Sequence, residues 1–127
     1  MDELWQANCG CIRQVLQQSG IAAESIIGVA VCGHGKGLYL WGKDSRPAYP
    51  GIGSTDNRAW RVTEQWYRDG TFERVYPQIC QRLLPCQQAA LLRWMKDTRP
   101  EVYRNIQFVF SAKDYIRFRL TGQAFSE

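Results

Sequence analysis

The sequence is poor in the residues and runs on which several classes of protein depend. Its 127 residues include one histidine, His34, so any Ser-His or Cys-His nucleophilic site would have to use that residue. No Gly-x-Ser-x-Gly nucleophile elbow occurs. No apolar run is long enough to cross a bilayer, and the chain does not open with the basic and apolar regions of a secretory leader. These absences argue against a hydrolase and against a membrane partner.

The five cysteines form no recognisable metal or disulfide pattern. Their number is odd, and no Cys-x-x-Cys pair occurs among them. A metal site made by Cys9, Cys11 and His34 is conceivable on residue type alone, but this spacing matches no zinc pattern. We therefore expect reduced cysteines that serve packing in a cytoplasmic protein.

The composition predicts one folded domain with a mild positive charge. With 45% hydrophobic and 13% aromatic residues, the chain can bury a core. The net charge of +4 arises mostly between Arg93 and Arg119, where seven basic residues stand against three acidic ones. Although Arg117 and Arg119 flank Phe118, the net charge is low for a surface that follows phosphates. We expect a solvated helical face here and no nucleic-acid partner.

The stretch around a cluster of glycines is the best candidate for a binding site. Ile26–Cys32 is apolar, rich in β-branched residues and without polar alternation, which predicts a strand buried on both faces. It leads into Gly33–Gly37, where three glycines let the backbone turn sharply and approach a ligand closely. Lys36 and His34 offer groups that bind hydroxyl or phosphate oxygens. The alternative is a tight turn between two strands with polar side chains facing solvent.

A second polar loop follows a predicted β-hairpin over residues 37–52, whose turn is expected at residues 45–47. Ser54–Arg58 then gathers hydrogen-bonding groups at the start of a helix, and Asp56 is its predicted N-cap. Ligands of open α/β sheets bind beyond the carboxyl ends of strands, so we place one site at these two loops. For Asp56 and Arg58, a helix cap and a surface charge remain the alternative.

Helical and strand patterns alternate along the rest of the chain, which predicts an α/β fold. Residues 1–19 carry an apolar stripe, and Gly20 stands where a left-handed cap would end their helix. Further elements are predicted as helices at 57–69, 72–81 (interrupted at Pro77), 89–96, 100–104 and 113–120, a loop at 83–87 and a strand at 106–110. No strand precedes the first helix, so we expect the chain to start part-way through a fold.

Four motifs in this order resemble the amino-terminal domain of the FGGY family of carbohydrate kinases, and within it the L-xylulose kinase type. The glycine loop resembles the family's sugar-contacting loop, and Gly35-Lys36-Gly37 is similar to its Gly-Lys-Gly form in L-xylulose kinases. Ser54–Arg58 resembles a Trp-Asn-Asp-x-Arg segment. The other two motifs are Ala90–Lys96 with Pro100-Glu101, similar to Leu-Leu-Trp-Leu-Lys…Pro-Glu, and Lys113–Gly122, similar to Lys-Asp-Tyr-x-x-x-x-Leu-Thr-Gly.

The resemblance implies an incomplete actin-like ATPase domain of the ribonuclease-H-like, α/β type over residues 1–127. It implies transfer of the γ-phosphoryl group of Mg-ATP to a hydroxyl of a ketopentose such as L-xylulose, catalysed mainly by positioning and charge stabilisation. In the family pattern, Gly35 and Lys36 contact the sugar and Asp56 and Arg58 line or brace its pocket. The resemblance implies two further, weaker sugar-binding positions, His34 and Gln87. The family usually has glutamine at the first, and the sequence of the loop around the second departs from that of other members.

The family's Asp-x-Gly phosphate turn, its catalytic aspartate and its ATP-binding domain have no counterpart within residues 1–127. We therefore expect a fragment that is inactive by itself, has no catalytic residue of its own, and binds neither ATP nor Mg²⁺ alone. A small-molecule sugar is its expected partner, and exposed strand edges predict self-association. The alternative is a non-enzymatic sugar- or partner-binding module built on the same domain.

Overall fold

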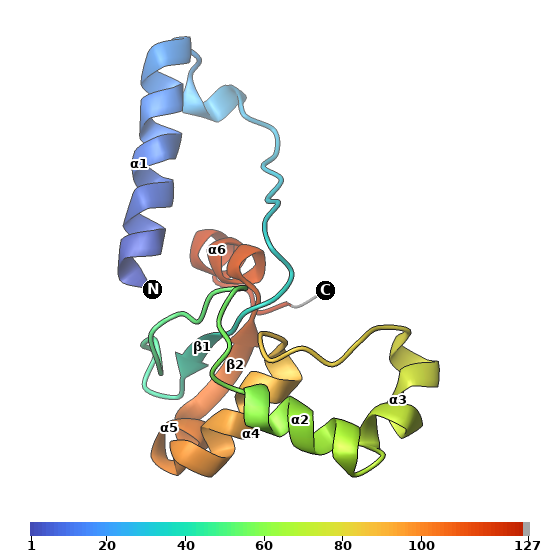
Figure 1. Cartoon of the computed structure of the whole chain (residues 1–127). Coiled ribbons are helices and arrows are strands. Elements are labelled where there is room, and N and C mark those ends of the chain that lie inside the picture. The colour runs from blue at the N-terminus through green and yellow to red at the C-terminus, as the bar shows by residue number, and fades with distance from the viewer. Residues whose placement is uncertain (126–127) are drawn as a thin grey trace.

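The computed structural model describes residues 1–125, and its centre is a two-stranded antiparallel sheet. Strand β1 (Tyr39–Gly42) pairs with β2 (Ile106–Phe110), with Tyr39 opposite Phe110 and an irregularity between Trp41 and Gly42. The strand predicted at 106–110 is therefore confirmed. The sheet joins two segments that are more than 60 residues apart in sequence, and it fixes the positions of the loops around it (Figure 1).

The predicted hairpin over residues 37–52 is also present. Leu38 forms an antiparallel bridge with Ile52, and Trp41 forms one with Pro47. The turn lies where it was predicted, and Ser45 adopts a positive φ of 60° within it. Short polar residues tolerate such turn conformations, which explains why the chain reverses direction here.

Six α-helices and one short 3₁₀ helix accompany the sheet within residues 1–125. Their bounds are α1 (Asp2–Ser19), η1 (Ala23–Ser25), α2 (Trp60–Arg68), α3 (Thr71–Ile79), α4 (Gln88–Thr98), α5 (Pro100–Asn105) and α6 (Ala112–Thr121). The predicted positive-φ glycine caps occur at Gly20 and Gly122, after α1 and α6. None of these helices is both long and apolar enough to cross a membrane. Helices on both sides of a sheet give the α/β class that was predicted.

Side chains of β1 alternate between two hydrophobic clusters, as the period of two in a strand requires. One cluster lies between the sheet and helices α2 and α4, and its buried members are Leu38, Leu40, Ile52, Ala59, Ala90, Leu91 and Met95. The other lies between the sheet and α6, and its buried members are Tyr39, Phe110, Tyr115 and Ile116. Leu91 and Met95 of α4 are completely buried in the first of these clusters.

Helix α1 extends away from the rest of the molecule (Figure 1). Only its first turns reach the core, where Met1, Leu4 and Trp5 pack against the cluster beside α6. The guanidinium of Arg119 in α6 lies 4.8 Å from the Trp5 ring and also pairs with Asp2. The predicted helix is confirmed. Most of its apolar stripe remains uncovered, because no residue of α1 is buried.

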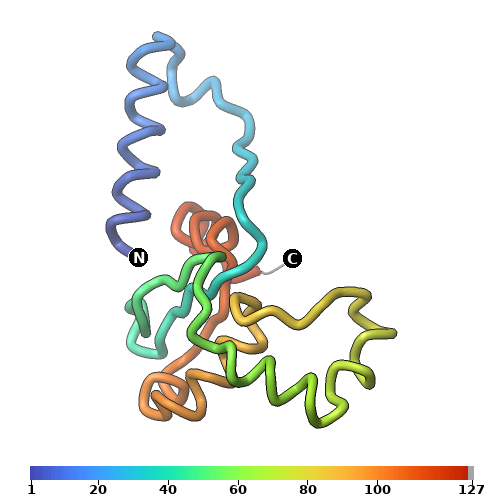
Figure 2. Tube along the Cα trace, viewed as in Figure 1, coloured from blue at the N-terminus to red at the C-terminus, as the bar shows by residue number. Residues whose placement is uncertain are grey.

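The predicted buried strand at Ile26–Cys32 is wrong. This segment is extended but pairs with no strand among residues 1–125, and Figure 2 shows it leading from α1 towards the sheet. Only near its end does it meet the core, where Val31 packs against the cluster beside α6. The side chains of Ile26, Ile27 and Val29 are 46%, 105% and 69% exposed. The segment does consist of apolar, mostly β-branched residues. Such residues form a buried strand only where neighbouring strands and helices cover them.

Two helix boundaries also differ from prediction. Helix α2 begins at Trp60, and its N-cap is Ala59 without a side-chain bond, so the N-cap role of Asp56 is wrong. The Asp56 carboxylate instead accepts a hydrogen bond from the Arg58 backbone N–H at 2.9 Å, a local turn that competes with helix formation. Helix α3 runs through Pro77 and ends at Ile79, so the predicted interruption at Pro77 is wrong and the helix ends two residues earlier than predicted.

Candidate functional site

The glycine loop is fixed at its carboxyl end by a close approach of two backbones. Gly37 has a φ of +90°, which only glycine adopts readily, and its N–H donates to the Cys86 carbonyl at 2.8 Å. A Cβ at this position would lie 2.4 Å from the Ile52 carbonyl oxygen. The requirement for glycine therefore comes from the positive φ and from the backbone of residues 52–54. The loop enters β1 at its amino end, so the prediction that it follows a strand end is wrong.

The loop lines an open cavity of about 280 Å³ together with the segment that connects α3 to α4. Its lining residues are Gly35, Lys36, Ile79, Gln81, Leu83, Gln87, Gln88 and Ala89. Lys36 is half-buried and is the one charged side chain in this lining. A single ammonium among three glutamines offers donors and acceptors for hydroxyl groups, with no carboxylate to repel an anion.

Gln87 shapes this cavity by bracing the loop. Its Oε1 accepts from the Leu84 N–H at 2.8 Å, and its Nε2 donates to the Gln81 side chain at 3.1 Å and to the Arg82 carbonyl at 3.0 Å. These bonds hold the segment before α4 in a fixed conformation. Gln87 thus lines the same cavity as Gly35 and Lys36, although about fifty residues of sequence separate it from them.

His34 lies beside this cavity rather than in its lining. Its ring is exposed, and its Nε2 lies 3.3 Å from the Tyr39 hydroxyl of β1. Burial of Tyr39 raises the pKa of its phenol, so the hydroxyl remains protonated at neutral pH. The one histidine of the chain is therefore connected to the sheet by a hydrogen bond.

Asp56 and Arg58 form an ion pair away from the Lys36 cavity. The Arg58 guanidinium donates to both carboxylate oxygens of Asp56 at 2.8 and 2.9 Å, and its centre lies 5.1 Å from the Trp94 ring. The hydrogen bonds from Arg58 lower the pKa of the Asp56 carboxyl, because they favour its charged form. A further bond joins Arg58 to the Tyr49 hydroxyl at 3.3 Å. The pair therefore braces the hairpin against α4.

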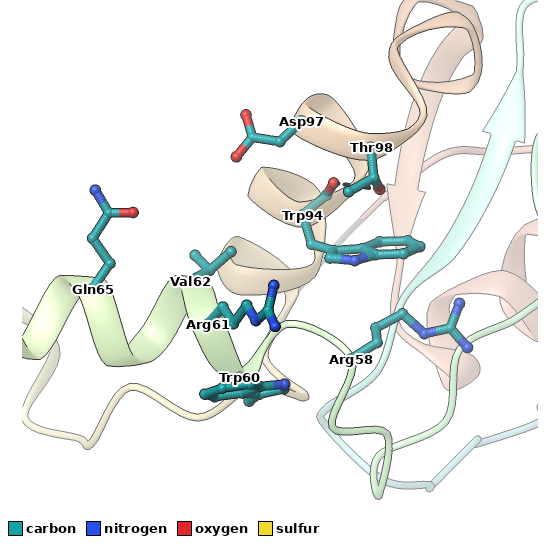
Figure 3. Close-up of a pocket in the computed structure, with 8 residues that line it drawn as sticks. All are labelled: Arg58, Trp60, Arg61, Val62, Gln65, Trp94, Asp97 and Thr98. Atoms are coloured by element: carbon teal, nitrogen blue, oxygen red, sulfur yellow. Dashed lines mark hydrogen bonds between the residues drawn. The ribbon is translucent and has the colours of Figure 1, made fainter.

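Arg58 also borders a second open cavity, of about 440 Å³, between α2 and α4. Figure 3 shows two arginines and two tryptophans gathered at one end of it, namely Arg58, Trp60, Arg61 and Trp94. Arg61 stacks on Trp60 with 5.3 Å between the guanidinium and the ring centre. Trp60 and Arg61 were not predicted as site residues, and the one signal for them in the sequence is the pair of arginines beside a tryptophan in Arg58-Ala59-Trp60-Arg61. The predicted site residues are thus divided between two cavities.

Residues 1–125 contain no group of three or more histidine, cysteine or acidic side chains placed to hold a metal ion. All five cysteines are free thiols, and Cys11, Cys32 and Cys80 are exposed. The polar side chains that line the Lys36 cavity are one ammonium group and three amides, which can bind a ligand through hydrogen bonds.

Comparisons with known proteins agree on one family. The family model described as the FGGY family of carbohydrate kinases, N-terminal domain, matches residues 1–127. The chain is 40% identical over 122 residues to an L-xylulose/3-keto-L-gulonate kinase of Escherichia coli (strain K12), covering 96% of this chain and 24% of that protein. It is 37% identical over 127 residues to a probable L-xylulose kinase of Pasteurella multocida (strain Pm70), covering 100% of this chain and 26% of that protein.

Solved structures show the same fold. A xyloylose kinase from Brucella ovis superposes with a TM-score of 0.77 at 24% identity, covering 88% of this chain and 22% of that one. A ligand-bound xylulose kinase from Lactobacillus acidophilus gives a TM-score of 0.66 at 27% identity, covering 69% of this chain and 18% of that one. The chain thus spans about a quarter of the length of the curated relatives it matches, 24% and 26% in the two cases given.

Proposed function

The chain belongs to the FGGY family of carbohydrate kinases, and we propose that it supplies sugar-binding residues to an ATP-dependent kinase that phosphorylates a ketopentose such as L-xylulose. The names of the relatives at 40% and 37% identity support this substrate class. The match to the whole chain supports an origin in the amino-terminal domain of such a kinase. The five free thiols support a cytoplasmic location.

The observation that carries the proposal is the position of Lys36. Its ammonium group borders a cavity of about 280 Å³ whose other polar side chains are Gln81, Gln87 and Gln88. Ammonium and amide groups together donate and accept hydrogen bonds, which is what recognition of a polyhydroxylated ligand requires. Gly35 leaves open space beside Lys36, since a Cβ there would meet nothing within 4 Å. In the proposed role, these residues bind and orient the sugar.

The same chain has no evident means of transferring a phosphoryl group by itself. Phosphoryl transfer needs a positioned nucleotide, Mg²⁺ and a base for the acceptor hydroxyl. Residues 1–125 contain no group of three or more histidine, cysteine or acidic side chains gathered together, and we assign no catalytic residue to them. We therefore propose that the isolated chain is inactive, and that Asp56 and Arg58 brace the sugar-binding region rather than take part in chemistry.

Thermal melting with and without L-xylulose tests the binding role. A ligand that binds only the folded state must raise the melting temperature, so millimolar L-xylulose is expected to shift the melt upward. Lys36→Ala is expected to abolish this shift. The matched control is Lys96→Ala, because Lys96 is an exposed lysine of α4 outside the lining of the Lys36 cavity. An equal shift in wild type and Lys36→Ala would contradict the proposal.

A coupled assay for ATP-dependent phosphorylation of L-xylulose tests the second part. The isolated chain is expected to give no turnover above the rate without protein. Measurable turnover that is lost in Lys36→Ala would show that the chain is an enzyme by itself, against the proposal.

A non-enzymatic binding module is the second candidate, favoured by the uncovered apolar segment between α1 and the sheet. Ile21, Ile26, Ile27 and Val29 are all exposed there, and exposed apolar patches mark interaction surfaces. We propose that this segment drives self-association. Sedimentation velocity is expected to show a mass that grows with protein concentration, whereas a monomer at every concentration would contradict this. Sugar binding without turnover, combined with a defined oligomer, would favour the module.

A further inference from the structure

The contact between His34 and Tyr39 joins the glycine loop to strand β1 of the sheet. Tyr39 is only 8% exposed, and its ring stacks on Tyr115 of α6 at 6.3 Å with an interplanar angle of 18°. Gly51 of the hairpin also lies close to this ring, because a Cβ added there would be 2.8 Å from it. The Tyr39 side chain is therefore held in place from two sides, and its hydroxyl is a fixed point for His34.

The direction of this hydrogen bond follows from the surroundings of the two groups. Tyr39 carries its proton at neutral pH, because burial raises the pKa of the phenol. His34 is the partner of its hydroxyl among residues 1–125, and a largely buried O–H without an acceptor is unfavourable. Of the two arrangements that the histidine tautomers allow, we infer the one in which Tyr39 donates and His34 Nε2 accepts. The proton of the neutral imidazole then lies on Nδ1, on the exposed ring.

The other end of the loop is anchored independently. Gly37 donates to the Cys86 carbonyl at 2.8 Å, and the next residue, Leu38, exchanges two backbone hydrogen bonds with Ile52 at 2.9 Å each. Only Gly35 and Lys36 lie between the anchored residues His34 and Gly37. With both ends fixed, the backbone that carries Lys36 has few conformations available.

We propose that Tyr39 is a positioning residue for the Lys36 loop, whose hydroxyl fixes the tautomer of His34 and thereby holds Lys36 at the cavity. Tyr39 is not part of the cavity lining and acts through His34. Insofar as the ligand is a sugar, this inference rests on the proposed function. Removing the hydroxyl does not change the Lys36 side chain itself. It lowers the fraction of molecules in which the loop holds Lys36 in the conformation that binds the ligand.

The imidazole of His34 gives a test that needs no ligand. The chain has one histidine, so its ring nitrogens give unambiguous signals in a long-range ¹H–¹⁵N correlation spectrum. Near pH 8, wild type is expected to show the Nδ1–H tautomer, with Nε2 as hydrogen-bond acceptor. Tyr39→Phe is expected to show the averaged signals of two exchanging tautomers. Identical spectra for the two proteins would overturn the proposal.

The dissociation constant for L-xylulose gives the second test. Tyr39→Phe keeps the stacked ring, so we expect a nearly unchanged melting temperature without ligand and affinity weakened by about three- to tenfold, the loss of one hydrogen bond. His34→Gln retains an acceptor for Tyr39 and is expected to bind more tightly than His34→Leu. Tyr103→Phe is the matched control, because Tyr103 is an exposed tyrosine of α5 outside this cavity.

A double variant separates positioning from independent effects. If Tyr39 acts through His34, then Tyr39→Phe combined with His34→Leu binds no more weakly than His34→Leu alone. Additive losses, or full affinity in Tyr39→Phe, would overturn the proposal. If wild type itself fails to bind L-xylulose, the proposed substrate is wrong, and the tautomer of His34 alone then decides whether Tyr39 fixes this loop.

Discussion

Replacing Gly37 by alanine perturbs the one backbone position at which the glycine loop and the hairpin meet. Gly37 has a φ of +90°, and an added Cβ would lie 2.4 Å from the Ile52 carbonyl oxygen and 3.2 Å from the Gly53 carbonyl carbon. Both neighbours are backbone atoms, so no side chain can rotate away. The chain must shift, and the two hydrogen bonds between Leu38 and Ile52 are the first to be lost.

The expected destabilisation follows from these two effects. A residue with a Cβ in the left-handed region costs about 1–2 kcal/mol. Each of the two lost backbone hydrogen bonds contributes about 0.5–1.5 kcal/mol. The free energy of unfolding of Gly37→Ala should therefore fall by about 2–5 kcal/mol. For a chain of this size, such a loss lowers the melting temperature by roughly 6–25 °C.

Thermal melting followed by circular dichroism measures this effect, and Gly53→Ala is its matched control. Gly53 lies beside the same bridge, has no positive φ, and has nothing within 4 Å of an added Cβ. We expect Gly53→Ala to melt within about 2 °C of wild type, as surface substitutions usually do. A Gly37→Ala variant that melts as high as Gly53→Ala would refute the close approach of Gly37 to Ile52.

Two further predictions concern local ionic and capping contacts. Because Arg58 lowers the pKa of Asp56 below its ordinary 3.8, the pair stabilises the fold above that pH and ceases to do so as the pH falls through the lower, folded-state pKa. Asp56→Asn should thus lose about 0.2–1 kcal/mol in urea unfolding at pH 7 and converge with wild type at strongly acidic pH; a constant difference would contradict this. The Ser111 side chain caps α6 in a reciprocal capping box with Asp114, so Ser111→Ala should lower the free energy of unfolding by about 0.5–2 kcal/mol. Ser25→Ala, at an exposed serine, should change it little, and equal losses in urea unfolding would argue against the cap.

Elements with their own local signals were predicted well. The strand Ile106–Phe110 has the predicted bounds, and the helix at 113–120 differs from α6 by one residue at each end, with Gly122 after it at a φ of 72°. Helix α1 was predicted because its apolar period and its Gly20 cap are both local features. Such elements are recognisable because side-chain periodicity and terminal glycines act within a few residues.

The failures occurred where a pattern has more than one structural outcome. The run Ile26–Cys32 is compatible with a buried strand, but burial depends on neighbours that a local pattern does not contain. Asp56 is compatible with an N-cap, yet Arg58 two residues later offers it a charged partner. The choice between these outcomes was made by contacts and not by propensity.

The candidate site shows the same division. The sequence singled out Gly35 and Lys36 through the glycine pattern and the family resemblance, and it named Gln87 on the resemblance alone. It could not show that Gln87 supports the cavity wall through three hydrogen bonds. Nor could it show that Arg58, with its partner Asp56, borders a different cavity from Lys36.

By itself, the sequence determined the α/β class, the family and the residues of the glycine loop, because residue types and their spacing carry this information directly. Only the tertiary structure decided that the Tyr39 hydroxyl contacts His34, that Gly37 contacts the backbone of Ile52, and that Ile26, Ile27 and Val29 are exposed. Each of these depends on segments brought together by the pairing of β1 with β2 and by the hairpin after it. Contacts between distant segments follow from the packing of the whole chain, which no local pattern encodes.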